Sequence, residues 1–99
     1  MWYAILSEDN DGSLPRRART RDAHLARVRQ LVAEGRLLVA GPHPAIDAEE
    51  PGEAGFSGSL IVAEFPSLDE ATQWANADPY VAAGVYRRVT VKPFRLVLP

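Results

Sequence analysis

The chain contains no cysteine, and only two of its 99 residues are histidines, His24 and His43. The lack of cysteine excludes disulfide bonds, thiolate metal sites and cysteine nucleophiles. Two imidazoles are too few to build a histidine-rich metal site in one chain, although carboxylate ligands stay available. We therefore expect neither a metal nor a cofactor.

The chain also has no large excess of positive or negative charge, because 11 basic and 13 acidic residues give a net charge of −2. A chain with this balance is not expected to bind nucleic acid. The exception is a cluster of arginines formed by Arg16, Arg17, Arg19 and Arg21. These arginines either attract an anionic substrate or form a solvated approach to the helix that follows.

Long apolar runs are missing as well. The apolar residues 1–6 are followed at once by the polar residues 7–11, without the basic start and apolar stretch of a signal peptide or a membrane span. We expect a cytoplasmic protein with no membrane partner. A chain of 99 residues is one domain, here residues 1–99, and buries roughly two-thirds of its unfolded surface.

Apolar periodicity and turn residues predict six main elements. Pro42 and Pro44 are expected to end the second strand, and Pro93 predicts an edge position or a bulge in the last one. Between the elements we expect a polar turn at residues 7–12 and an exposed loop at 45–57, which is either a lid or binding loop or merely mobile. The predicted strands are 2–6, 36–40, 59–65 and 89–98, and the predicted helices are 20–34 and 67–77.

This order, βαββαβ, with right-handed crossovers predicts the ferredoxin-like α+β sandwich, a four-stranded antiparallel sheet with both helices on one face. The first and third strands are apolar on both sides, whereas a sheet face in contact with water normally alternates with polar residues. Something must cover the open face. The simplest cover is a second copy of the chain, so we expect a homodimer.

A short stretch, Asp78 to Gly84, has the pattern of an additional helix start and stop. Asp78 accepts the free amides of a first turn, and the proline after it suits the first helical position. So short a helix must be held by packing, and we expect it to form the wall of a pocket, with Tyr80 facing the substrate. Asp78 is either a cap alone or a cap with a functional carboxylate.

His24 shares a helix face with Val28 and Leu31 and points toward the sheet. An imidazole on an apolar face is either a general acid or base, or a core histidine with a satisfied hydrogen bond. The predicted topology brings His24 and Asp78 to one rim, where the carboxylate would fix the tautomer of the ring.

Three further residues are candidates for substrate binding at the same rim. Ser59 could add a hydroxyl donor, and Gly41 and Pro42 could shape the floor; the alternative for all three is turn chemistry. His43, between two prolines, is expected to be an exposed loop residue.

Several motifs together resemble the YCII-related (YciI-like) family along nearly the whole chain. The resemblance implies a ferredoxin-like α+β fold and dimers of the α/β-barrel type with sheets back to back. It also implies a cleft centred on a histidine and an aspartate, which correspond to His24 and Asp78. The motifs are Arg21-Asp22-Ala23-His24-Leu25, residues 34–42, Gly55-Phe56-Ser57-Gly58-Ser59, residues 78–85 and Val91-Lys92-Pro93-Phe94.

Two functions are compatible with these observations. Relatives of the family resemble muconolactone isomerases and chloromuconolactone dehalogenases, which act on small anionic lactones by proton abstraction and elimination. The first hypothesis is therefore a small lyase, isomerase or dehalogenase in which His24, oriented by Asp78, moves a proton. The second is a non-catalytic homodimer that binds a small metabolite or a partner through the same cleft.

Overall fold

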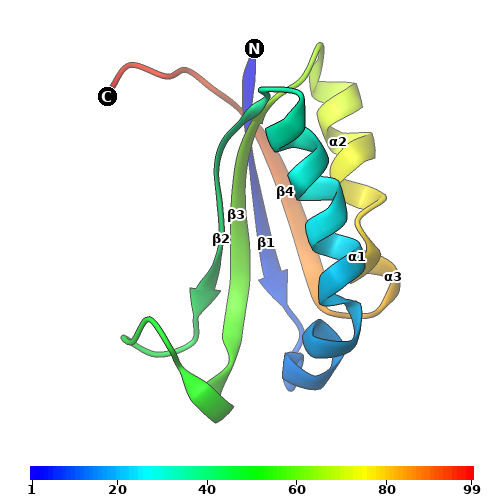
Figure 1. Ribbon diagram of the computed structural model, residues 1–99, viewed down its shortest axis with the longest axis vertical. Helices are drawn as coiled ribbons and strands as arrows, with labels where there is room; N and C mark the ends of the chain where they lie inside the picture. Colours follow the sequence, from blue (N-terminus) through cyan, green and yellow to red (C-terminus); the bar gives the residue numbers. More distant parts are fainter.

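The computed structural model describes residues 1–99 and has the predicted order of elements, with the helices on one side of a single sheet (Figure 1). The sheet order is β2-β3-β1-β4, and all three neighbouring pairs are antiparallel. The ferredoxin-like prediction is confirmed. The elements are β1 (Trp2–Asp9), α1 (Leu14–Ala33), β2 (Leu37–Pro44), the 3-10 turn η1 (Gly52–Ala54), β3 (Phe56–Glu64), α2 (Leu68–Asn76), α3 (Pro79–Ala82) and β4 (Tyr86–Phe94).

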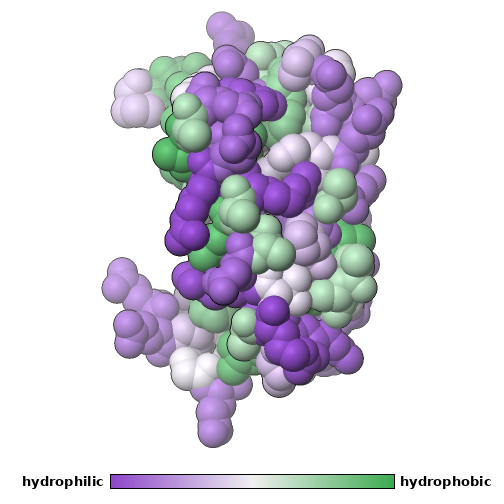
Figure 2. Space-filling view, turned by 45° about the vertical axis from the view of Figure 1, so that its right-hand side comes forward, coloured by the Kyte–Doolittle hydropathy of each residue, from purple (hydrophilic) through white to green (hydrophobic).

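The core lies between the sheet and the two long helices. Alternate residues of the central strands point into it, such as Ile5 of β1 and Ile61 of β3, and α1 contributes Val28 and Leu31. Burial of such aliphatic side chains stabilises the fold by about 1.5–3 kcal/mol each. The outer side of the helical layer carries mainly hydrophilic residues (Figure 2), and no helix is long and apolar enough to cross a membrane.

Capping explains where α2 begins, as predicted. The Oγ of Ser67 accepts the amide of Glu70 at 3.1 Å, and Asp69 and Glu70 place negative charge in the first turn. Acidic residues are favourable there because the helix dipole leaves partial positive charge at this end.

Two boundaries at the start of the chain were predicted wrongly. β1 continues to Asp9 instead of ending at residue 6, because Ser7 pairs with both Ser59 of β3 and Val89 of β4 in the middle of the sheet. Helix α1 begins at Leu14, not at residue 20, with Pro15 in its first turn. The arginine cluster therefore belongs to the helix and does not precede it.

The prolines of β2 do not end that strand. β2 runs to Pro44, and Pro42 pairs with Ser59, with a register shift between His43 and Pro44. The prediction failed because β2 lies at an edge of the sheet, where a residue without an N–H is tolerated. The exposed loop is correspondingly shorter than 45–57, since it contains η1 and ends where β3 begins at Phe56.

At the other edge, β4 spans Tyr86–Phe94 and not 89–98. Pro93 lies within it, opposite Tyr3 of β1, so the edge position predicted from this proline is confirmed. Residues 95–99 follow the strand outside any helix or strand, and extend away from the body of the molecule at the end where the N-terminus also lies (Figure 1).

Candidate active site

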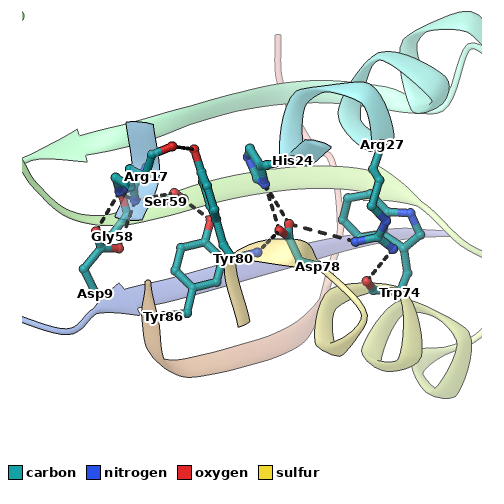
Figure 3. Close-up of polar contacts among 10 residues, drawn as sticks. All are labelled: Asp9, Arg17, His24, Arg27, Gly58, Ser59, Trp74, Asp78, Tyr80 and Tyr86. Atoms are coloured by element: carbon teal, nitrogen blue, oxygen red, sulfur yellow. Dashed lines mark hydrogen bonds and ion pairs between the residues drawn. The ribbon is translucent and has the colours of Figure 1, made fainter. Parts of the chain in front are cut away.

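His24 and Asp78, which are 54 residues apart, are in direct contact. Nδ1 of His24 lies 2.8 Å from Oδ2 and 3.0 Å from Oδ1 of Asp78 (Figure 3). Their side chains are only 10% and 3% exposed. Because a carboxylate can only accept, this hydrogen bond requires a proton on Nδ1 of the neutral ring and leaves the lone pair on Nε2.

Asp78 is placed by the short helix α3 that it caps. Its Oδ1 accepts the backbone N–H of Tyr80 at 2.9 Å. Gly84 ends the segment with a φ of 75°, a conformation that favours glycine. One carboxylate thus starts α3 and orients the imidazole of His24 on α1, which ties the two elements together.

Tyr80 provides a flat wall beside the histidine. Its ring stacks on the His24 ring with centroids 4.1 Å apart and an angle of 11° between the planes. The phenol donates a hydrogen bond to the backbone carbonyl of Arg17 at 3.4 Å. Burial raises the pKa of Tyr80, so this phenol stays protonated near neutral pH.

The pair opens into a cavity of about 250 Å³ between α1, β2 and β3. Nε2 of His24 has no hydrogen-bond partner. It is not fully buried either, because Arg27 Nη1 is the only side-chain nitrogen or oxygen that is both fully buried and unpaired. Nε2 is therefore accessible. The predicted binding residues are gathered here, while Asp78 lies behind the histidine. The lining residues are Arg17, Arg21, His24, Leu25, Val28, Ala40, Gly41, Pro42, Ser59, Ile61 and Tyr80.

The lining of this cavity includes Arg21, for which no carboxylate partner is found, and it includes no carboxylate; the charge of the other lining arginine, Arg17, is balanced by its ion pair with Asp9. Such a cavity favours a small anion. A larger, shallower depression of about 750 Å³ beside Trp74 contains no histidine, so we place the candidate chemistry in the smaller cavity. No group of three or more potential metal ligands is present.

A second buried polar cluster, centred on Arg17, lies on the other side of Tyr80 (Figure 3). The Arg17 guanidinium donates to both carboxylate oxygens of Asp9, at 2.7 and 2.9 Å, and to the hydroxyl of Ser59 at 3.0 Å. Burial lowers the pKa of Arg17, but the hydrogen bonds and charge of Asp9 outweigh this effect and raise it. Arg17 is therefore a buried ion-pair partner and not the solvated residue that was one of two expectations.

Ser59 belongs to this cluster and also faces the cavity. Its hydroxyl accepts a hydrogen bond from the phenol of Tyr86 at 2.9 Å. Burial raises the pKa of Tyr86 to about 12, so its phenol is a donor across the physiological range. The orientation of the Ser59 hydroxyl is thus set by Arg17 and Tyr86 together.

Sequence reasoning missed Asp9, Tyr86 and the specific role of Arg17. One signal was available: Arg17 precedes His24 by seven residues, which is two helical turns, so both side chains lie on the same helix face. This relation was missed because the helix was predicted to begin at residue 20, which left Arg17 outside it. His43 is exposed, as expected, but it lies within β2 and not in a loop.

Together the fold and the site define a ferredoxin-like α+β protein with a buried His–Asp pair beside a small cationic cavity. The chain belongs to the family of YCII-related domain proteins, whose model matches residues 1–95. It is 58% identical to Protein YciI of Escherichia coli over 97 residues, which cover 98% of this chain and 99% of that protein. It is 55% identical, over the same shares, to a protein of Haemophilus influenzae.

A solved structure extends the likeness to a protein with a described activity. The chain is similar to the 5-chloro-2-hydroxyhydroquinone dehydrochlorinase TftG of Burkholderia phenoliruptrix, which was solved in complex with 2,5-dihydroxybenzoquinone. The TM-score is 0.84 and the sequence identity 27%, with 97% of this chain and 95% of that chain covered.

Proposed function

We propose that this protein is a small enzyme in which His24, oriented by Asp78, transfers a proton on a small anionic, lactone-like or hydroxyquinone-like substrate. The observation that carries the proposal is the contact of 2.8 Å between His24 Nδ1 and Asp78, which leaves the basic Nε2 accessible beside a cavity. A carboxylate bonded to one ring nitrogen stabilises the imidazolium that forms when the other nitrogen takes a proton.

The lining of the cavity supports an anionic substrate. Arg21 supplies positive charge, and Ser59 supplies a hydroxyl, while Gly41 and Pro42 line the cavity along β2. A negative charge that develops on a substrate oxygen is stabilised by such groups in a partly enclosed site.

The likeness to TftG supports elimination among the possible proton-transfer reactions. A dehydrochlorination removes one proton and one chloride: the base takes the proton, the C–H electron pair forms a new double bond, and chloride leaves with the C–Cl pair. In our proposal His24 Nε2 is the base and later returns its proton to water. An isomerisation would use the same first step and return the proton to another carbon.

The experiment measures proton exchange as well as turnover. The protein is incubated in D₂O with chlorinated hydroxyquinols and with muconolactones, and both deuterium incorporation and chloride release are followed. We expect the wild-type protein to be active and His24→Gln to lose at least a hundredfold in rate, the usual contribution of a general base.

His43→Gln is the matched control, because it removes the other histidine, which is exposed outside the cavity. It should retain the wild-type rate. A compound that binds the protein in a thermal-shift assay without exchange or release would instead favour the non-catalytic binding function. Equal rates for His24→Gln and the wild type would rule out His24 as the base.

A further inference from the structure

Arg27 on α1 contains the one fully buried side-chain nitrogen or oxygen that has no hydrogen-bond partner, its Nη1. Leaving a buried donor unpaired is unfavourable, so such an atom in a folded protein calls for an explanation. The atom that lies opposite is Oδ2 of Asp78, at 4.0 Å, which is within the range of an ion pair but beyond a hydrogen bond (Figure 3).

The rest of the Arg27 guanidinium is held firmly. Nη2 donates to the backbone carbonyl of Trp74 at 2.8 Å, and the group lies over the Trp74 ring with its central carbon 4.3 Å from the centroid. Trp74 lies in the last turn of α2, where backbone carbonyls lack partners within the helix. Arg27 therefore bridges α1, the end of α2 and the carboxylate of Asp78.

Asp78 has room for this second partner. Its Oδ1 accepts from the amide of Tyr80 and from His24, whereas Oδ2 accepts from His24 alone. A carboxylate oxygen can accept two hydrogen bonds, so Oδ2 has one site left. His24 and Arg27 are three residues apart on α1, the spacing that places two side chains on the same side of a helix.

We infer that Arg27 is a positioning residue that shares the Asp78 carboxylate with His24 and thereby weakens the hold of His24 on its proton. When His24 is neutral, Arg27 is the cation facing Asp78, and a small movement closes the gap of 4.0 Å. When His24 is protonated, two cations share one carboxylate and repel each other. Arg27 thus favours the neutral ring, the form that the proposed base requires.

The direction follows from the other charges around the pair. Removing Arg27 leaves His24 as the only cationic partner of Asp78, so the imidazolium becomes more stable. Tyr80 and Tyr86 do not change charge in the relevant range, because burial raises the pKa of both. The other charged groups near the site are Arg17 and Arg21 on α1 and Asp9 on β1, and Asp9 is occupied by Arg17.

The test is an NMR titration of the two histidine rings, which needs no substrate. Arg27→Gln removes the charge and keeps a shorter, uncharged polar side chain. We expect the His24 titration to move upward by about half to one pH unit, as for the loss of a like charge several Å away. Arg27→Lys should move it less, and His43 should titrate as in the wild-type protein.

Arg29→Gln is the matched control, because it removes one positive charge from an exposed position of the same helix. An unchanged His24 titration in folded Arg27→Gln, or an equal shift in Arg29→Gln, would overturn the inference. If Arg27→Gln does not fold, the wild-type protein decides: the Arg27 side-chain ¹⁵N signals should change with the His24 titration, and signals that stay constant would also overturn it.

This inference adds to the proposed function at the same site, yet the two can fail separately. A His24 titration that responds to Arg27 in a protein that catalyses nothing would leave the inference intact and remove the enzyme. If His24 transfers a proton but its titration does not change in the Arg27 variants, the proposed function stands and the inference about Arg27 is wrong.

Discussion

Asp78 has two roles that make different demands on one side chain. Its Oδ1 accepts the Tyr80 amide as a helix cap, and both oxygens contact Nδ1 of His24. Asparagine caps a helix about as well as aspartate, but it is uncharged and does not stabilise an imidazolium to the same extent. The two roles can therefore be separated by substitution.

We predict that Asp78→Asn keeps a thermal midpoint close to that of the wild-type protein while the His24 ring titrates at lower pH and any activity falls. Asp78→Ala should in addition lose about 0.5–2 kcal/mol of stability, the usual cost of a missing cap. Thermal unfolding and NMR titration measure the two effects. Equal destabilisation by both variants, with an unaltered His24 titration, would mean that Asp78 is only structural.

Tyr86 links stability to alkaline pH. Its pKa in the folded protein is about 12 because the phenol is buried, against about 10 in an unfolded chain. Below pH of about 10 the phenol is protonated in both states, and its full contribution to stability is present. Between about pH 10 and 12 only the unfolded state ionises, so stability falls by roughly 1.4 kcal/mol per pH unit.

We therefore predict that Tyr86→Phe loses less stability between pH 10 and 12 than the wild-type protein does. The variant lacks the hydrogen bond to Ser59 and should start from a lower stability at pH 9. Urea unfolding at a series of pH values measures the slopes. Parallel declines of the two proteins would show that the Tyr86 phenol does not cause the alkaline loss.

At the scale of elements, α1 supplies three of the polar side chains at the site. Arg17, His24 and Arg27 contact β1, α3 and α2 in turn. Arg17 also donates to the carbonyl of Gly58 on β3 at 3.0 Å, so α1 is bonded to both β1 and β3, which pair with each other. A change in that pairing should therefore reach the site.

Gly58 offers the test of this connection. A Cβ built at this position would lie 2.0 Å from the backbone oxygen of Ser7, so Gly58→Ala must push β3 away from β1. We predict a loss of about 1–3 kcal/mol, as for overpacking in a core. Gly41→Ala, with nothing within 4 Å, should stay within about 0.5 kcal/mol of wild type in denaturant unfolding. Similar stabilities of the two variants would contradict the prediction.

At the scale of the whole molecule, the sheet face opposite the helices is left uncovered by the chain itself (Figure 1). Large apolar side chains on it stay exposed, among them Leu6 at 39%, Val39 at 48% and Phe94 at 37%. Leu6 lies on the central strand β1, opposite Leu60 of β3. We propose that a second copy of the chain covers this face, because a continuous apolar surface is normally an interaction site.

The corresponding prediction is a homodimer that buries more than about 1,200 Å² in total, the lower end for stable interfaces. Leu6→Glu should dissociate it, because a carboxylate would have to lose its water in the interface. Leu68→Glu, at a position on α2 that is 45% exposed, should leave it intact. Sedimentation at micromolar concentration decides, and a wild-type monomer would contradict the proposal.

The amino-acid sequence by itself determined the βαββαβ order and identified His24 and Asp78 as the candidate pair. Helical periodicity put His24 on the buried face of α1, and the Asp-Pro pair at 78–79 marked a helix start, since both signals depend on residues a few positions apart. Once the topology was known, the meeting of these two residues followed.

Only the tertiary structure decided which polar residues are buried and where the strands end. Arg17 is buried with Asp9 because Gly58 and Ser59, more than 40 residues away, complete the hydrogen bonds of its guanidinium. Pro42 fits into β2 because that strand lies at an edge of the sheet. Arg27, the second partner of Asp78, likewise depends on a distant segment, because its guanidinium is held by the carbonyl and the ring of Trp74 on α2. Local patterns carry no information on such partners, because their contacts form only when distant segments pack together.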